Sequence, residues 1–328
     1  MGIFRPFHVK RAPVLTKLLS SAGFKLVDIG GRGSAFSPFI PLAKFADYYA
    51  VEPDAEEAER LRKQIPEEGL WRSVTVIPEA IASKHGHADL YVTRRPGMSS
   101  LLEPNRTVTG RYVLDSKFEV VSVVKVPTIP LDEAASRYGF SDAAFIKLDT
   151  QGSELEILQS GSQLVGGPLL GIHVETHFHR FYKGQSFFAD VDAYLRAQGY
   201  ELFSLSRTLL RRAKYRESHY SRRVIAWAHC LYLREPEALL ATAGDATGDR
   251  LSRLLGLALA FKFYDLALEV VDVAARAGAI AAANVEKLRE EVSGICTLGT
   301  AHVLENLWNQ DVADEPTAPT FRDRAHRE

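Results

Sequence analysis

The chain has 328 residues, which is enough for one large domain or two. Of these residues 46% are apolar and 25% are charged, as in ordinary soluble globular proteins. The 40 basic and 41 acidic side chains leave a net charge of −1, which argues against a general affinity for nucleic acid. Charged residues interrupt the N-terminus, and no apolar run approaches the roughly 20 residues of a membrane span. We therefore expect a cytoplasmic protein without a membrane span.

Apolar segments typical of buried strands alternate with helical patterns along most of the chain. The seven expected strands lie at 25–30, 47–53, 73–82, 143–149, 169–176, 200–206 and 224–233. Helical spacing is found between them at 54–65, 131–139, 153–161 and 187–199. This alternation predicts an α/β fold, with a mostly parallel seven-stranded sheet and helices on both faces.

The pattern also divides the chain into parts. We expect a helical lead-in (1–24), a sheet domain (25–234) with an inserted hairpin and lid (86–130), a helical C-terminal extension (235–310) and a disordered tail (311–328). The extension contains two to four amphipathic helical segments. They could pack on the sheet, bind a partner or form the interface of a homodimer.

A glycine-rich turn, "VDIGGRGS", follows the first expected strand. Glycines at this place allow close approach of a ligand, and Glu52 ends the next strand where an acid can bind ribose hydroxyls. A dinucleotide fingerprint requires a third glycine, but Phe36 stands in its place. An acid near the turn suits the positively charged sulfonium and amino group of S-adenosylmethionine better than it suits the pyrophosphate of a dinucleotide. A nicotinamide-dependent oxidoreductase or epimerase stays the alternative, as does a turn without any ligand.

A second polar turn interrupts "FIKLDTQGSELEIL" where the fourth strand passes into a helix. Asp149 ends the strand, and Thr150 and Gln151 could serve an acceptor or only the turn. Glu154 falls in the first turn of the helix, where an acid is favoured by the helix dipole alone. The segment therefore predicts either a tight turn or the floor of a site.

In their order, these motifs resemble the FkbM-type S-adenosylmethionine-dependent methyltransferases. The resemblance runs from about Lys25 to Ser206 and includes "VDIGGRGS", "VEPD", "MSSLL", "PLDEA", "DTQGSE" and "HVET". It implies a class I, Rossmann-like methyltransferase that methylates a hydroxyl of a sugar, glycan or natural product. Ser34 departs from the family, which often has a further glycine there. The C-terminal extension lies outside the resemblance, and a non-catalytic cofactor-binding module stays a second alternative.

The resemblance also implies roles for individual residues. The methionine part of the cofactor would lie against Asp28, Gly30, Gly31 and Gly33, the ribose against Glu52 and Pro53, and the adenine near Glu79 and Ala80. Asp149 would adjoin the transferred methyl group.

Catalysis is expected from Asp149, Glu175 and His177, because a hydroxyl acceptor needs a group to orient it and take its proton. Ser99 and Ser100 would belong to a lid, and Thr150, Gln151 and Glu154 would face the acceptor. If His173, Glu175 and His177 share one face of a strand, a divalent metal could bind there, although no metal is predicted.

Overall fold

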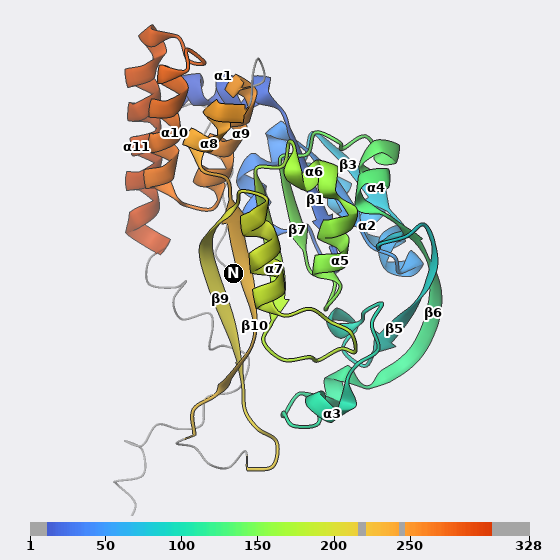
Figure 1. The fold of residues 1–328 in the computed structure, drawn as a ribbon. Helices are drawn as coiled ribbons and strands as arrows, with labels where there is room; N and C mark the ends of the chain where they lie inside the picture. The colour runs from blue at the N-terminus through green and yellow to red at the C-terminus, as the bar shows by residue number, and fades with distance from the viewer. Residues whose placement is uncertain (1–11, 216–220, 243–246, 304–328) are drawn as a thin grey trace, which may run out of the picture.

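The computed structural model describes residues 12–215, 221–242 and 247–303. Its centre is a seven-stranded sheet with the order β3-β2-β1-β7-β8-β10-β9 (Figure 1). The strands are β1 (Phe24–Ile29), β2 (Ala46–Val51), β3 (Ser73–Ile77), β7 (Phe145–Leu148), β8 (Gly171–His177), β9 (Glu201–Leu210) and β10 (Val224–Leu233). All neighbours pair in parallel except β10, which is antiparallel to both β8 and β9. The predicted mostly parallel seven-stranded sheet is confirmed.

Alternate residues of the strands feed two hydrophobic cores, one on each face of the sheet. On β1, Leu26 joins one core and Val27 the other. The core of Val27 is covered by α4 (Leu131–Tyr138), α5 (Glu154–Ser160), α6 (Ser162–Gly166) and α7 (Phe188–Ala197). The opposite core is covered by α1 (Pro13–Ala22), η2 (Ser37–Phe45), α2 (Ala55–Glu67) and the C-terminal helices. Helices on both faces follow from strands that are buried on both sides.

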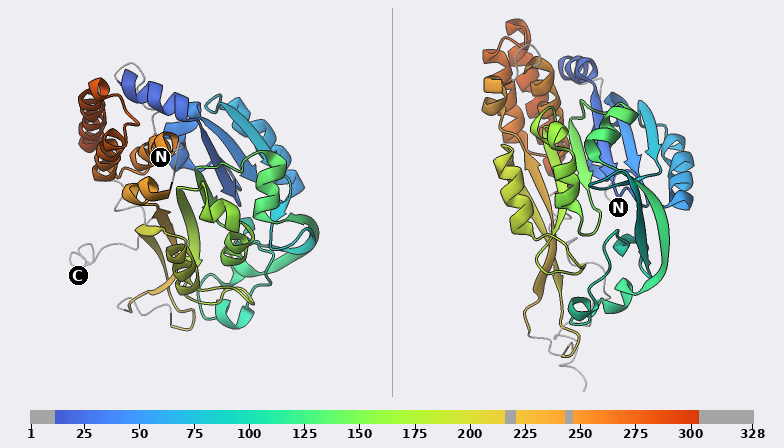
Figure 2. Two further views of the ribbon diagram at one scale, coloured as in Figure 1. Left: turned by 45° about the horizontal axis from the view of Figure 1, so that its top comes forward. Right: turned by 45° about the vertical axis from the view of Figure 1, so that its right-hand side comes forward.

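The C-terminal helices pack on the sheet and on α1 (Figure 2). They are α8 (Pro236–Thr242), α9 (Thr247–Ala260), α10 (Tyr264–Arg276) and α11 (Ala282–Val303). A Cβ at Gly256 of α9 would lie 2.6 Å from Phe24 of β1, so glycine is required for this close approach. The carboxylate of Glu291 in α11 accepts the backbone N–H groups of Val14 (3.2 Å) and Leu15 (2.8 Å) at the start of α1. The extension therefore completes one face of the core and caps the first helix.

A small second sheet, β4-β6-β5, carries the inserted segment. Its strands are β4 (Ala80–Ile81), β5 (Gly86–Thr93) and β6 (Val120–Ile129), and β5 and β6 pair in antiparallel fashion. Between them lie η3 (Pro96–Met98), α3 (Arg106–Thr109) and η4 (Asp115–Phe118). The expected tail lies outside the described residues. Within the described part of the chain, no helix has the length and apolar character needed to cross a bilayer.

Candidate active site

A pocket opens at the carboxyl ends of β1, β2 and β7, where the strand order of the sheet reverses. Its empty space, including the part open to solvent, is about 870 Å³, which is sufficient for a small organic ligand. The predicted site residues that line it are Gly30, Glu52, Pro53, Ala80, Ser99, Ser100, Asp149, Thr150 and Gln151. Segments that are far apart in the sequence therefore meet at one pocket.

The glycine turn lets β1 approach the end of β7. Gly30 has φ +78°, and a Cβ there would lie 2.0 Å from the backbone oxygen of Asp149. Gly33 also has a positive φ, +98°, but a Cβ there would meet nothing within 4 Å. Gly31 would place its Cβ 3.1 Å from the Asp28 carboxyl carbon. Gly31 and Gly33 shape the turn without lining the pocket, whereas Gly30 does both.

Asp28 is buried behind the turn rather than in the pocket. Its carboxylate accepts the Tyr48 hydroxyl at 2.6 Å and lies 3.0 Å from Lys147 Nζ. Lys147 in turn donates to the backbone oxygen of Gly30 at 2.7 Å. Burial by itself would lower the pKa of Lys147, but the negative charges of Asp28 and Asp149 outweigh it and keep the pKa above its usual value. Asp28 therefore acts on the turn through Lys147.

Glu52, which follows β2, is the acid on the β1–β2 side of the pocket. The residue is 5% exposed, and its carboxylate accepts the backbone N–H of Asp54 at 2.9 Å. Burial raises the pKa of Glu52 to about 7. Of the two residues expected near an adenine, Ala80 lines the pocket, while Glu79 accepts the Tyr138 hydroxyl at 2.5 Å and turns toward α4.

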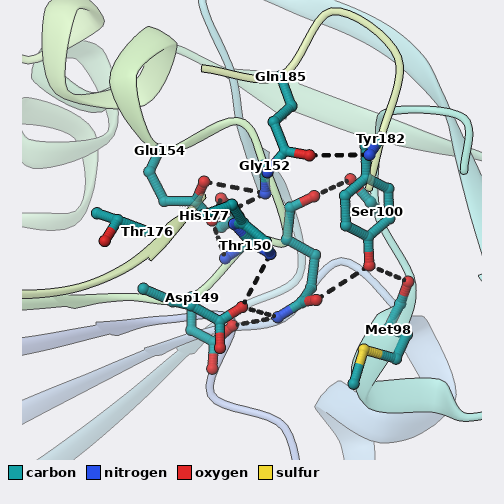
Figure 3. Close-up of polar contacts among 12 residues, drawn as sticks. Met98, Ser100, Asp149, Thr150, Gly152, Glu154, Thr176, His177, Tyr182 and Gln185 are labelled. Atoms are coloured by element: carbon teal, nitrogen blue, oxygen red, sulfur yellow. Dashed lines mark hydrogen bonds and ion pairs between the residues drawn. The ribbon is translucent and has the colours of Figure 1, made fainter. Parts of the chain in front are cut away.

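The polar turn after β7 is held by its own side chains (Figure 3). The Glu154 carboxylate accepts the backbone N–H groups of Thr150 and Gly152 at 2.9–3.0 Å. It also accepts the Thr150 hydroxyl at 3.1 Å. Because Glu154 is buried, its pKa is raised to about 7. Glu154 thus caps the turn, and the residues of the turn that reach the pocket are Asp149, Thr150, Gln151 and Ser153.

Gln151 lies at the centre of a network of buried polar groups. Its Nε2 donates to Asp149 Oδ1 at 2.7 Å and to Glu175 Oε1 at 2.6 Å. Burial would raise the pKa of Asp149, but Lys147, His229 and the Gln151 hydrogen bond lower it overall. The pKa of Glu175 is raised, first by burial and then by the charge of Asp149. The pKa values of the two carboxyl groups are therefore shifted in opposite directions, although the two groups share one donor.

The histidines of this region lie behind the pocket. His177 is only 2% exposed, and its burial lowers its pKa to about 3. Its Nε2 lies 3.5 Å from Glu175 Oε1, and it does not line the pocket. His229 of β10 stands directly opposite Glu175 of β8, with Nε2 3.5 Å from Glu175 Oε2. Sequence reasoning missed His229, because the strand pairing that places it there leaves no local pattern.

The inserted segment, which was expected to form a lid, contacts the same turn. Ser100 donates its hydroxyl to the backbone oxygen of Gln151 at 2.9 Å, while Ser99 accepts the N–H of Thr93 at 3.1 Å. The Tyr182 hydroxyl lies 2.8 Å from the oxygen of Met98 and 3.0 Å from Gln151 Oε1 (Figure 3). Tyr182 and Lys147 were not predicted as site residues. Lys147 could have been found from the sequence, because it is the one charged residue inside an otherwise apolar strand.

The pocket therefore lies at the switch point of the sheet, with Glu52 after β2 and Asp149 after β7. The model of the Methyltransferase FkbM domain matches residues 34–202, just over half of the chain. The chain therefore belongs to the FkbM family of S-adenosylmethionine-dependent methyltransferases, which confirms the resemblance found in the sequence.

Solved methyltransferase structures resemble the chain only distantly. Precorrin-6y C5,15-methyltransferase from Geobacter metallireducens is 11% identical with a TM-score of 0.33, over 68% of this chain and 87% of its own. Sp1610 of Streptococcus pneumoniae, a putative tRNA (m1A22) methyltransferase, is 11% identical with a TM-score of 0.32, over 86% and 97%. TrmK of M. capricolum, in complex with S-adenosyl-homocysteine, is 10% identical with a TM-score of 0.31, over 86% and 97%. No curated protein matches the chain. The family match, rather than these likenesses, carries the assignment.

Proposed function

We propose that this methyltransferase is an O-methyltransferase that acts on a hydroxyl group of a sugar, a glycan or a related natural product. The observation that supports a hydroxyl acceptor is Asp149, a carboxylate whose pKa is lowered and which lines the cofactor pocket. A carboxylate in this place can accept a hydrogen bond from a hydroxyl and take its proton.

The residues of the pocket fit the cofactor. Gly30, which lines the pocket, approaches the Asp149 backbone so closely that only glycine fits there. Glu52 would accept the ribose hydroxyls, the Gly30 turn would hold the methionine part, and Ala80 would border the adenine. When bound, S-adenosylmethionine supplies an electrophilic methyl group attached to a sulfonium.

Asp149 would carry out the chemistry contributed by the chain. It would orient the acceptor so that the hydroxyl oxygen forms the new C–O bond while the C–S bond of the sulfonium breaks, its electron pair remaining on sulfur. The proton of the hydroxyl then passes to Asp149. Gln151 would hold the Asp149 carboxylate in position, because it donates to that carboxylate and to Glu175 at once.

The first experiment measures binding by thermal shift and calorimetry with S-adenosylmethionine, S-adenosyl-homocysteine and NAD. We expect stabilisation by the first two ligands only. Transfer of a labelled methyl group is then measured with a panel of sugars, nucleotide-linked sugars and simple amines. Label found on a nitrogen rather than an oxygen would overturn the O-methyltransferase proposal. Stabilisation by NAD alone would also overturn the assignment of S-adenosylmethionine as the cofactor.

A further inference from the structure

Ligand atoms suited to a cation converge beside the cofactor pocket. Among the described residues, Asp149, Glu175 and His229 each offer one atom, and these atoms all lie within 4.8 Å of one another. They come from the residue that follows β7, from β8 and from β10. Lys147, the cation next to Asp149, lies closer to Asp28, at 3.0 Å, than to Asp149, at 4.0 Å. Lys147 therefore pairs mainly with Asp28 and only weakly with Asp149.

Gln151, which bridges two of these groups, is held in a costly backbone conformation. Its φ is +60°, a region that residues other than glycine rarely adopt, and it is 6% exposed. Ser100 fixes its backbone oxygen from the lid. Residues other than glycine in this conformation are strained, and they cluster at functional sites. The surrounding contacts therefore hold Gln151 in place despite its strained backbone.

The hydrogen bonds of Tyr182 point to a second orientation of the Gln151 amide. The Tyr182 hydroxyl lies 2.8 Å from Met98 O and 3.0 Å from Gln151 Oε1, yet it has one hydrogen for these two acceptors. A 180° rotation of the amide exchanges Nε2 and Oε1 with almost no change of shape. Nε2 would then donate to Tyr182, and Tyr182 would donate to Met98. Every group on this side would be satisfied.

The same rotation has the opposite effect on the other side of Gln151. Its oxygen would stand where Nε2 now lies, 2.7 Å from Asp149 Oδ1 and 2.6 Å from Glu175 Oε1. Three oxygens in contact repel one another unless a proton on one of the carboxyl groups or a cation lies among them. The amide can therefore bridge the carboxylates through its NH₂ group, or join them as a ligand when a cation is bound.

We propose that a hard divalent cation, Mg²⁺ or Mn²⁺, binds beside the cofactor pocket and holds the oxygen of the methyl acceptor. Four side chains would ligate it: Asp149, Gln151, Glu175 and His229. Carboxylate and amide oxygens with one imidazole suit this class of ion. Four protein ligands leave two positions of an octahedron for water or acceptor oxygens. The inference rests on the proposed O-methyltransferase function and adds to it how the acceptor is held.

The cation also changes the path of the proton. With Asp149 serving as a ligand, the acceptor hydroxyl bound to the cation becomes more acidic, as metal-bound water does. Its proton would leave to water at the open side of the pocket. Transfer of the methyl group to the oxygen is otherwise as described above.

The test uses the full chain, freed of metal with EDTA, and Mn²⁺ as the probe. Binding is followed by electron paramagnetic resonance, with and without S-adenosyl-homocysteine. We expect one Mn²⁺ per chain and at least tenfold weaker binding in His229→Ala. His177→Gln is the matched comparison, because His177 also contacts Glu175 but is not among the four ligands, and it should weaken Mn²⁺ binding less than His229→Ala does.

A gain-of-function variant guards against misfolding as an explanation. Gln151→Glu adds a third carboxylate to the site, and we expect it to bind Mn²⁺ at least threefold more tightly than the wild type. Weaker binding in Gln151→Glu, or loss of binding in His177→Gln but not in His229→Ala, would overturn the ligand set. A wild-type chain that binds S-adenosyl-homocysteine but no Mn²⁺ would overturn the inference and leave the proposed function intact. A chain that binds neither would count against both.

Discussion

The two halves of the pocket are built in different ways. On the β1–β2 side the pocket is mainly backbone: a glycine turn, and Glu52 anchored to the amide of Asp54, two residues along. On the β7–β8 side it is a network of side chains from the lid, the turn after β7, β8 and β10. The first half depends on local conformation and the second on tertiary contacts. Substitutions should therefore affect cofactor binding on one side and turnover on the other.

The largest effect is expected from Gly30→Ala. The new methyl group would clash with the Asp149 backbone at 2.0 Å and would sit at φ +78°. We expect a loss of about 3 kcal/mol or more in the free energy of unfolding, together with loss of cofactor binding. Gly33→Ala is the matched control, since φ is also positive but no atom lies within 4 Å, and about 1 kcal/mol is expected. Urea denaturation measures both, and equal losses would argue against the close approach as the cause.

Asp149→Asn tests the catalytic half. The amide keeps the shape of the side chain but cannot take a proton, so we expect turnover to fall by about 10²–10³-fold. The affinity for S-adenosyl-homocysteine should stay within a few-fold of the wild type by calorimetry. If affinity falls as much as turnover, the two halves are not separable at this residue.

Glu52→Gln tests the cofactor half. Losing a charged acceptor for the ribose hydroxyls should weaken S-adenosyl-homocysteine binding by about 10–50-fold. Turnover at saturating cofactor should change by less than about threefold, because Glu52 would not touch the acceptor. A large fall in turnover at saturation would contradict the division of roles.

The pKa of Glu52, about 7, predicts how cofactor binding depends on pH. If the ionised form binds the ribose, the Kd for S-adenosyl-homocysteine should rise about tenfold from pH 8 to pH 6. Glu52 also affects stability. Between pH 4.5, its usual pKa, and about pH 7, its pKa in the folded chain, the unfolded chain has lost the proton of Glu52 but the folded chain keeps it. The free energy of unfolding therefore falls as the pH rises through this range. Calorimetry at several pH values checks the first effect, and Glu52→Gln should show a flat profile.

The smallest effect is expected in the lid. Ser100→Ala removes the hydrogen bond to the strained Gln151, which should lower turnover about fivefold. Ser99→Ala is the control, because Ser99 also lines the pocket but its hydroxyl accepts the N–H of Thr93 and makes no hydrogen bond to Gln151 in the described network. Steady-state kinetics of both variants decides whether the lid acts through Gln151. Equal effects would mean that the loop is merely loosened.

Most of the fold and the cofactor half could be predicted from the sequence. Buried strands and amphipathic helices have periods that local sequence records, and the order of strands and helices follows from them. Gly30 and Glu52 stand at the ends of such strands, so their place at one edge of the sheet was predictable. The helical extension was also visible, but its packing against Phe24 and its cap on α1 were not.

What only the tertiary structure decided is the network around Gln151. The register of antiparallel β10 against β8 brings His229 to Glu175. The lid and the loop after β8 bring Ser100 and Tyr182 to the turn. Contacts between strands and loops distant in the chain leave no periodic trace in the sequence. The sequence therefore determined the fold and the class of cofactor, whereas burial and strand register determined which side chains surround Asp149 and Gln151.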